Sequence, residues 1–188
     1  YGSGTGETGA AAVLVDGRLV SADVLLAAQA GGHEVTTVES LDVATGELHP
    51  IQAAFVESGA LQSGYSAGAM VLATLALLER VPDPSESEIR DALSGILDRE
   101  TGYVKVVDAV QRAAALLRGE KPEPMAPVLV GRLTDGAGET VPDAPAAVPR
   151  LVPAADVPPT TVVGRGVPKV DALKLAKGHP AFVDDIEL

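Results

Sequence analysis

The side chains that most often hold metals or act as nucleophiles are scarce in this sequence. There is no cysteine, which removes disulfides, zinc–thiolate sites and ordinary iron–sulfur ligation together. The three histidines, His33, His49 and His179, lie far apart and lack the i,i+4 spacing of a helical zinc site, so they predict no zinc set. Residues 2–6 are Gly-rich, as in a phosphate-binding loop, but no Lys-Ser or Lys-Thr pair follows them. The spacing does not favour a Ser–His–Asp triad either.

Charge and composition exclude several classes of partner. The formal net charge is −12, which disfavours nucleic acid and anionic membrane surfaces, because both are bound by clustered Lys and Arg. No apolar run approaches the roughly 18 residues that indicate a membrane span. Hydrophobic residues make up 46% of the chain and aromatic residues only 3%, so the core must consist mainly of Ala, Val and Leu. We expect a cytoplasmic protein without a signal peptide, and the start without Met indicates a fragment.

The first 47 residues predict a small sheet. Two apolar stretches, residues 12–15 and 18–20, flank Asp16-Gly17, a dipeptide that favours a two-residue hairpin turn. A third strand is expected at residues 35–38, and residues 24–30 could form a strand or a helical turn. So few short strands are not stable alone in water. We therefore expect more strands before Tyr1, or strands supplied by another chain.

The pattern becomes helical at His49. A first helix should open at Pro50, where a missing N–H costs nothing, and stop at Gly59. Further helices are predicted over residues 67–80, over a segment that follows a capping box of Ser85 and Glu88, and over residues 104–118. The side chains expected to face inward in the last helix are Val106, Val107, Val110, Ala114 and Leu117. Four short helices in this span indicate a compact helical domain.

The amino-acid composition changes again after Gly119. Ten of the fourteen prolines lie between residues 122 and 168, which indicates an extended linker. The stretch from residue 162 to residue 188 regains apolar content but is too short to form a core of its own.

Three blocks of the sequence resemble segments of the xanthine-oxidase family of molybdenum hydroxylases. Residues 3–17 resemble its plant-ferredoxin-type cluster loop and the strand after that loop. Residues 61–66 (Leu-Gln-Ser-Gly-Tyr-Ser) and 97–103 (Leu-Asp-Arg-Glu-Thr-Gly-Tyr) resemble its L-Q-C-G-x-C and L-C-R-C-T-G-Y segments. Residues 163–172, continuing to residue 186, resemble the opening of its molybdopterin-binding subunit. Both halves in one chain, with no flavin domain between them, are similar to the single-chain aldehyde oxidoreductases of the family.

The resemblance implies two sets of former cluster-ligand positions, each holding a residue other than cysteine. The first set consists of Ser3, Thr8, Ala11 and Asp23. The second set consists of Ser63, Ser66, Asp98 and Glu100. The resemblance also implies a pterin contact for Gln62, although a polar residue at a helix start explains this position equally well. The family would have two [2Fe–2S] clusters and a molybdopterin cofactor, whereas no cofactor is expected in this chain.

The fold class predicted from these features is α+β. A partial β-grasp, ferredoxin-like segment (residues 1–47) precedes a four-helix domain of the [2Fe–2S]-binding type (48–119). An extended Pro-rich linker (120–161) and the start of a molybdopterin-binding domain (162–188) complete the chain. The expected partner is a molybdopterin-binding domain or subunit, and a homodimer is possible.

Two functional interpretations remain open. In the first, the chain is the iron–sulfur, electron-transfer region of a molybdenum hydroxylase, now free of clusters and serving as scaffold and interface. Ferric ions bridged by sulfide demand soft, strongly donating ligands, and all eight former ligands are replaced. In the alternative, Ser, Asp and Glu side chains hold a [2Fe–2S] cluster or a hard cation such as Mg²⁺ or Ca²⁺. Either way, no complete active site is expected within the chain.

Overall fold

The computed structural model describes residues 4–41, 47–99, 104–122, 131–133, 151–153 and 169–179, the two three-residue ranges by their backbone alone. The chain divides into two compact units. Residues 1–123 and 168–188 form the larger unit, and residues 124–167 form the smaller one. All the predicted site residues belong to the larger unit.

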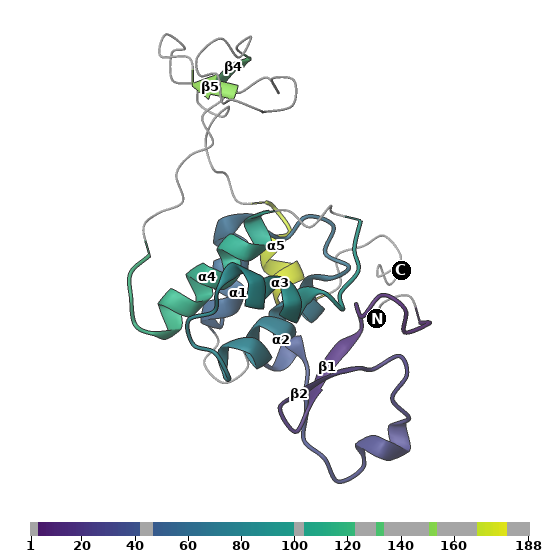
Figure 1. Cartoon of the computed structure of the whole chain (residues 1–188). Coiled ribbons are helices and arrows are strands. Elements are labelled where there is room, and N and C mark those ends of the chain that lie inside the picture. The colour runs from purple at the N-terminus through teal and green to yellow at the C-terminus, as the bar shows by residue number, and fades with distance from the viewer. Residues whose placement is uncertain are drawn as a thin grey trace, which may run out of the picture. The chain divides into compact units, whose positions relative to one another are not determined.

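A three-stranded antiparallel sheet opens the larger unit (Figure 1). Strands β1 (Ala12–Val15) and β2 (Arg18–Ser21) form the predicted hairpin, and β3 (Val35–Thr36) pairs with the other side of β1. The turn residues Asp16 and Gly17 have φ values of 48° and 74°. Two positive φ values in succession define the type I′ turn that Asp-Gly favours, so the hairpin prediction is confirmed.

Two short 3₁₀ helices take the place of extended chain in this segment. Helix η1 (Ala27–Ala30) settles the choice between strand and helical turn in favour of the turn. Helix η2 (Val38–Leu41) begins where the third strand was predicted to end, so β3 is shorter than predicted. The side chain of Val38 is buried. Its burial explains why an apolar pattern typical of a strand continues into a helical turn.

Helix α1 (Pro50–Ser58) begins and ends where the sequence predicts. The ring Nδ1 of His49 accepts a hydrogen bond from a first-turn N–H at 3.3 Å, and Gln52 Oε1 accepts one from the His49 N–H at 3.0 Å. These two bonds satisfy donors that a helix N-terminus otherwise leaves free. Gly59 ends the helix in the left-handed conformation with φ 66°, which glycine adopts without strain.

Three further helices complete the predicted helical region. Helix α2 (Ala67–Leu78) is buried on most of its surface, whereas α3 (Glu86–Leu93) buries one large side chain, Ile89. Helix α4 (Val104–Leu117) packs along α1 through an apolar stripe. Four of its five predicted inward residues are buried, but Leu117 is 46% exposed, so that part of the prediction is wrong. Leu117 is the last residue of the helix, where the core no longer covers the stripe.

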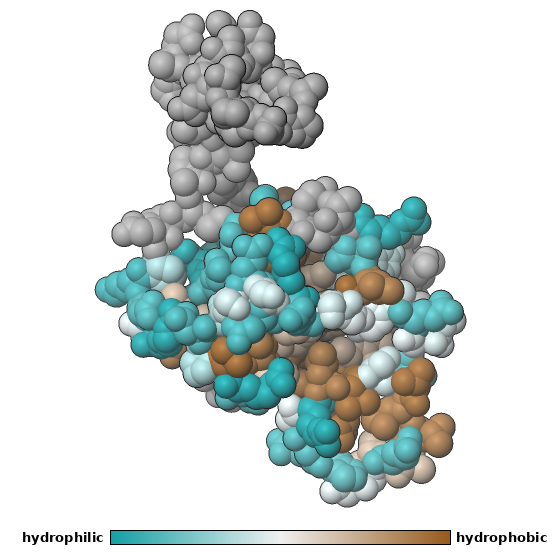
Figure 2. Space-filling model, viewed as in Figure 1, coloured by the Kyte–Doolittle hydropathy of each residue, from teal (hydrophilic) through white to brown (hydrophobic). Residues whose placement is uncertain are grey.

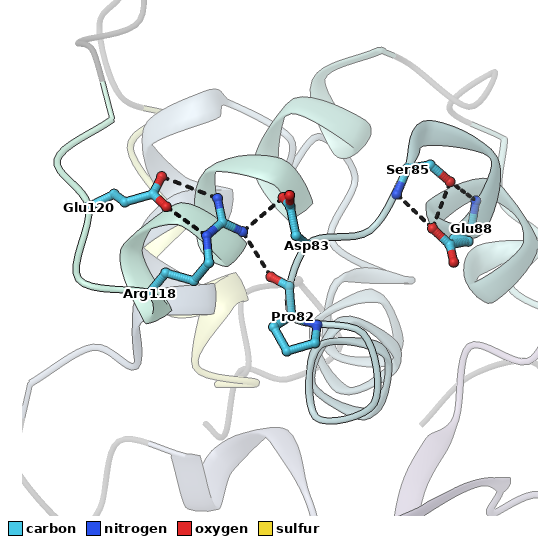
Figure 3. Close-up of polar contacts among 6 residues, drawn as sticks. All are labelled: Pro82, Asp83, Ser85, Glu88, Arg118 and Glu120. Atoms are coloured by element: carbon cyan, nitrogen blue, oxygen red, sulfur yellow. Dashed lines mark hydrogen bonds and ion pairs between the residues drawn. The ribbon is translucent and has the colours of Figure 1, made fainter.

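Polar contacts fix the start of α3 and the end of α4 (Figure 3). The Glu88 carboxylate accepts hydrogen bonds from the Ser85 N–H at 2.8 Å and hydroxyl at 2.7 Å, and Ser85 Oγ accepts one from the Glu88 N–H at 3.3 Å. The predicted capping box is therefore present. Just after α4, Arg118 pairs with Glu120 at 2.7 Å and with Asp83 at 2.9 Å. Arg118 thus joins the end of α4 to the loop before α3.

A fifth helix from the far end of the sequence also belongs to the larger unit. Helix α5 (Ala172–Ala176) packs against α1 and α2. The assignment of residues 162–188 to a molybdopterin-binding domain stays a prediction. In the smaller unit, β4 (Gly131–Leu133) and β5 (Leu151–Pro153) form an antiparallel pair inside the segment predicted as a linker. Among the described residues, no helix has the length and apolarity needed to cross a membrane.

Candidate functional site

Three of the four positions in the first predicted ligand set lie in the described part of the chain. They are Thr8, Ala11 and Asp23, whereas Ser3 lies outside it. Ala11 directly precedes β1, and Asp23 comes two residues after β2. The Ala11 carbonyl accepts a hydrogen bond from the Ala22 N–H at 2.7 Å. The hairpin register thereby brings Ala11 and Asp23 to the same end of the sheet.

The loop that carries Thr8 lies tightly against the segment after α3. A Cβ atom added at Gly9 would come within 2.2 Å of the Gly95 carbonyl oxygen, and Gly9 has φ 65°. The Thr8 carbonyl accepts a hydrogen bond from the Leu97 N–H at 2.7 Å. Leu97 is next to Asp98 in sequence, so the two predicted ligand sets meet across this backbone contact. Sequence reasoning gave the two sets but not their contact.

Asp23 is placed beside the Gly-rich loop and is only partly satisfied. A Cβ atom added at Gly6 would come within 3.9 Å of the Asp23 Cβ, so the loop and Asp23 lie side by side. Asp23 Oδ2 and the nearby Ser21 Oγ are buried, and neither has a hydrogen-bond partner among the described residues. A buried polar atom without a partner costs on the order of 1–3 kcal/mol. This end of the hairpin therefore contains two buried oxygen atoms whose hydrogen-bonding capacity is not met by the described residues.

The donor chemistry of the first set does not fit a [2Fe–2S] cluster. The Thr8 hydroxyl accepts a hydrogen bond from the Ala10 N–H at 3.3 Å, and Ala11 carries no donor atom. Asp23 is the only carboxylate of the set, and a carboxylate is a hard ligand. Such a cluster is normally held by four thiolates. The close-fitting loop is therefore present, whereas the ligands that would hold iron are not.

In the second set, Ser63, Ser66 and Asp98 are described and Glu100 lies outside the described residues. Ser63 is exposed in the loop before α2, while Ser66 is only 3% exposed at the start of that helix. The Ser66 hydroxyl makes one weak contact, with Met70 Sδ at 4.0 Å, and does not cap the helix. Asp98 is partly buried in the loop after α3. The convergence of these side chains on one point remains a prediction.

Gln62 is exposed and makes a local bond. Its side-chain Nε2 donates to the Gly59 carbonyl at 2.6 Å, which satisfies an otherwise free group at the end of α1. The bond gives Gln62 a structural role in the turn between α1 and the second ligand loop. The contact with a pterin stays a prediction that rests on the resemblance.

Two described histidines shape the local electrostatics without forming a metal set. His33 Nδ1 lies 2.5 Å from Asp16 Oδ2, and the hydrogen bond with His33 lowers the pKa of Asp16. Half-burial lowers the pKa of His49, because desolvation disfavours the charged imidazolium. A neutral His49 suits its role, since Nδ1 must be free of a proton to accept the bond from the helix.

Sequence reasoning missed the buried residue Gln52. Its side chain is 0% exposed, and Nε2 donates to the Val38 carbonyl at 3.3 Å and to the Ala176 carbonyl at 3.0 Å. Together with the bond to the His49 N–H, Gln52 joins η2, α1 and α5. The one available signal is its position three residues after the N-cap, where Gln completes a capping box. That signal does not reveal the contact with a residue 124 positions away.

Comparisons with known proteins identify a matching domain family and several relatives. The [2Fe-2S] binding domain family matches residues 37–111. The nicotinate dehydrogenase small FeS subunit of Eubacterium barkeri is 40% identical over 112 residues, which cover 60% of this chain and 71% of that protein. The probable hypoxanthine oxidase XdhD of Escherichia coli is 31% identical over 187 residues, 97% of this chain and 16% of that protein.

A solved structure extends the likeness to the fold. The aldehyde oxidoreductase from Desulfovibrio desulfuricans superposes with a TM-score of 0.67 at 26% sequence identity. The match covers 98% of this chain and 18% of that one. This chain therefore spans less than a fifth of the larger proteins that it matches along nearly its whole length. Within the described residues, no group of three or more His, Cys, Asp or Glu side chains is arranged to hold a metal ion.

Proposed function

Because the chain belongs to the xanthine-oxidase family of molybdenum hydroxylases, we propose that it is a [2Fe–2S]-type region that keeps the scaffold of electron transfer without the clusters. Its relatives include an iron–sulfur subunit and longer oxidoreductases of this family. In this proposal, the larger unit serves as an interface for a molybdopterin-binding domain or subunit. The finer fold, a ferredoxin-like segment followed by a four-helix [2Fe–2S]-binding-type domain, is part of the same proposal.

The proposal rests on a contrast at the first ligand set. The loop fits closely against its neighbours, whereas its ligand positions lack the donor atoms that hold iron. Gly9 fits against the Gly95 carbonyl so closely that any side chain would clash, and the Thr8 carbonyl accepts a hydrogen bond from the Leu97 N–H. At the ligand positions themselves, Ala11 offers no donor and the sequence holds no cysteine. A close-fitting loop whose ligand positions lack suitable donor atoms supports a role for the surface rather than for the metal.

A second candidate is an electron-transfer module, or a hard-cation site, that uses oxygen ligands. The observation in its favour is the buried Oδ2 of Asp23, which has no hydrogen-bond partner among the described residues. Oxygen donors suit Mg²⁺ and Ca²⁺, but these ions take six or more ligands. Asp23 is the only carboxylate of the first set, so a cation there would keep most of its water ligands and be held weakly, and the cluster-free scaffold is the better supported proposal.

Iron and acid-labile sulfide analysis of the purified chain, with an absorption scan of the visible region, tests the proposal. We expect no iron, no sulfide and no visible band after anaerobic reconstitution and gel filtration. The matched controls restore cysteine at the four positions of the first set, or of the second set, or of both. Each restored set should bind about two irons and two sulfides, because thiolates are the ordinary ligands of this cluster.

The cysteine variants allow each result of the iron and sulfide analysis to be interpreted. About two irons and two sulfides in the unaltered chain would overturn the proposal and support oxygen ligation. Loss of that iron in Asp23→Asn would then identify the first set as the site, and its persistence would point to Asp98 or Glu100. Calorimetric titration with Mg²⁺ and Ca²⁺ decides the remaining alternative, in which the cluster-free chain binds a hard cation.

A further inference from the structure

We infer that residues 169–179 are a docking segment and that the surface they cover is a specific binding site for this segment, which can leave the site and return to it. We call this surface the α5 surface and define it by Val38, Gln52 and Gly64. The inference deepens the proposed function, on which it rests, because it names a surface through which the scaffold holds a later segment of the chain. It also links that surface to the loop of the second ligand set.

The segment shows the burial pattern of a helix that binds through one face. Ala172, Leu175 and Ala176 are 2%, 3% and 0% exposed. Leu173 is 50% exposed, and Val170 is fully exposed on the turn before the helix. The buried positions are spaced i, i+3 and i+4, as expected for one helical face. Helix α5 has only five residues, so it needs this surface in order to stay helical.

Polar contacts determine the direction in which a helix can bind to the α5 surface. Gln52 Nε2 donates to the Ala176 carbonyl at 3.0 Å, at the end of α5 where carbonyls lack partners within the helix. Gln52 is completely buried, and its amide also bonds to the Val38 carbonyl. Without the segment, this amide would keep only the longer of the two bonds. A helix that docks here must therefore place its C-terminal carbonyl, and not its N-terminus, over Gln52.

Two glycines, one on each side of the interface, let the surfaces approach closely. A Cβ atom added at Gly64 would lie 2.4 Å from Leu175 Cδ2, and one added at Gly178 would lie 2.6 Å from Val38 Cγ1. Both glycines have positive φ, 89° and 72°. The site thus selects a helix with small residues at two positions, a leucine between them and a glycine after the end. Complementarity of this kind is specific to one occupant and one register.

Charge favours the same occupant. Residues 169–179 carry three lysines and one aspartate, whereas residues 1–123 carry eighteen acidic and eight basic residues. A basic segment that returns to an acidic unit is drawn to it at long range, most strongly at low salt. More than 50 residues separate Leu117 from Ala172, so the contact is not imposed by chain connection.

The docked helix also covers part of the second ligand set. Gly64 lies between Ser63 and Ser66, and Leu175 rests on it. The position of this loop therefore depends on whether α5 is bound. Undocking should change the environment of the loop, and docking should restore it, whether or not the loop ever held a cluster.

The test uses the complete chain with a protease site inserted within residues 134–150 and cleaved after folding. We expect the C-terminal piece to stay bound through gel filtration and to be displaced by an added peptide of residues 165–179. Leu175→Ala in the peptide should weaken its binding about thirtyfold, which corresponds to about 2 kcal/mol of lost packing. Leu173→Ala is the matched control, since it removes the same side chain from the exposed face, and should change binding less than about twofold.

A second pair of variants probes the receiving surface. Gly64→Ala should weaken peptide binding at least about tenfold, because its methyl group occupies the place of Leu175. Gly32→Ala is the control for backbone strain: Gly32 has φ 84° and nothing within 4 Å of an added Cβ. Amide resonances of residues 61–66 should shift when the C-terminal piece is removed and return when the peptide is added to the parent, and the peptide should restore them less in the Gly64→Ala chain.

Two outcomes would overturn the inference. One is separation of the cleaved pieces while the far-ultraviolet spectrum of the N-terminal piece stays helical. The other is equal peptide affinity for Leu175→Ala and Leu173→Ala. Fluorescence anisotropy of a labelled peptide does not depend on iron content. Docking can therefore fail while the chain proves cluster-free, or succeed while iron is found, and the two proposals are judged separately.

Discussion

The sheet segment (residues 4–41) and the helical region (50–117) differ sharply in how they are held together. Of the apolar residues that are buried in the described structure, only Leu14 and Val38 come from the sheet segment. The helical region supplies most of the rest, including Phe55, which is completely buried. Figure 2 shows apolar side chains gathered over the sheet segment in the view drawn. Its exposed large apolar residues are Leu19, Val24, Leu26 and Val35.

The difference indicates which of the two regions would have depended on bound metal for its stability. Bound structural metal can contribute on the order of 10 kcal/mol to the folding of a small domain. The helical region has an apolar core that can replace such a contribution, whereas the sheet segment has two buried anchors and a loop bonded to Leu97. We therefore expect the stability of the sheet segment to depend on docking to the helices. The reverse dependence should be weak.

The largest expected effect comes from Phe55→Ala, which should lower the free energy of unfolding by about 3–5 kcal/mol because it leaves a cavity in the core. Leu14→Ala should instead release the sheet segment and leave the helical region folded. Urea denaturation followed by circular dichroism measures the first effect, and limited proteolysis with amide exchange measures the second. In Leu14→Ala, cleavage before His49 should accelerate while residues 49–118 stay resistant.

Leu26→Ala serves as the control, because Leu26 is 67% exposed. It should change stability by less than about 0.5 kcal/mol. If Leu14→Ala destabilised the helices as much as Phe55→Ala, the two regions would form one cooperative unit and the comparison would fail. Equal cleavage of both regions in the unaltered chain would lead to the same conclusion.

The features that the sequence predicted well are those set by short-range rules. Asp16-Gly17 specifies its turn through backbone preferences alone, and Gly59 does the same at a helix end. Ser85 and Glu88 lie three residues apart and form their hydrogen bonds without contacts from the rest of the fold. The family resemblance supplied the positions of the candidate site, since nothing in the chemistry of Ala11 indicates a former ligand.

The features that the sequence did not predict depend on distant contacts. The bond from Gln52 to Ala176 requires a return of the chain that no local pattern specifies. Val38 was predicted in a strand because its apolar character fits one, but it lies in a helical turn, packed against Gly68 of α2 and Gly178 after α5. Likewise, the contact between Thr8 and Leu97 joins two loops whose approach is decided by packing alone.

A smaller effect is expected from the capping box that starts α3 (Figure 3). Ser85→Ala should lower stability by about 1 kcal/mol, because it removes the acceptor for the Glu88 N–H. Ser87→Ala is the matched control, an exposed serine in the first turn of the same helix.

The hydrogen bonds from Ser85 also lower the pKa of Glu88. The stabilisation by the ionised Glu88 is therefore present above the unfolded pKa of glutamate and is lost as pH falls through the lower folded value. Urea denaturation at neutral and acidic pH measures both, and equal losses for Ser85→Ala and Ser87→Ala would contradict the capping role.

The smallest expected effect concerns His49, and it sharpens the comparison because His49 marks the border between the two regions. Its Nδ1 accepts a bond from the first turn of α1 only while unprotonated, and half-burial lowers the pKa of the ring. The unfolded state, with an ordinary pKa of about 6.5, therefore binds a proton more readily than the folded state. It follows that the contribution of His49 to stability is fully present above about pH 6.5 and falls as pH decreases toward the lower folded pKa.

His49→Asn keeps a capping acceptor that does not titrate, so its melting temperature should fall less between about pH 7 and pH 5 than that of the unaltered chain. His33→Asn is the control, since it removes the histidine of the sheet segment while leaving the α1 cap unchanged. A melting temperature whose slope with pH is flattened by His33→Asn and not by His49→Asn would place the titration in the sheet segment and contradict the proposed role of His49.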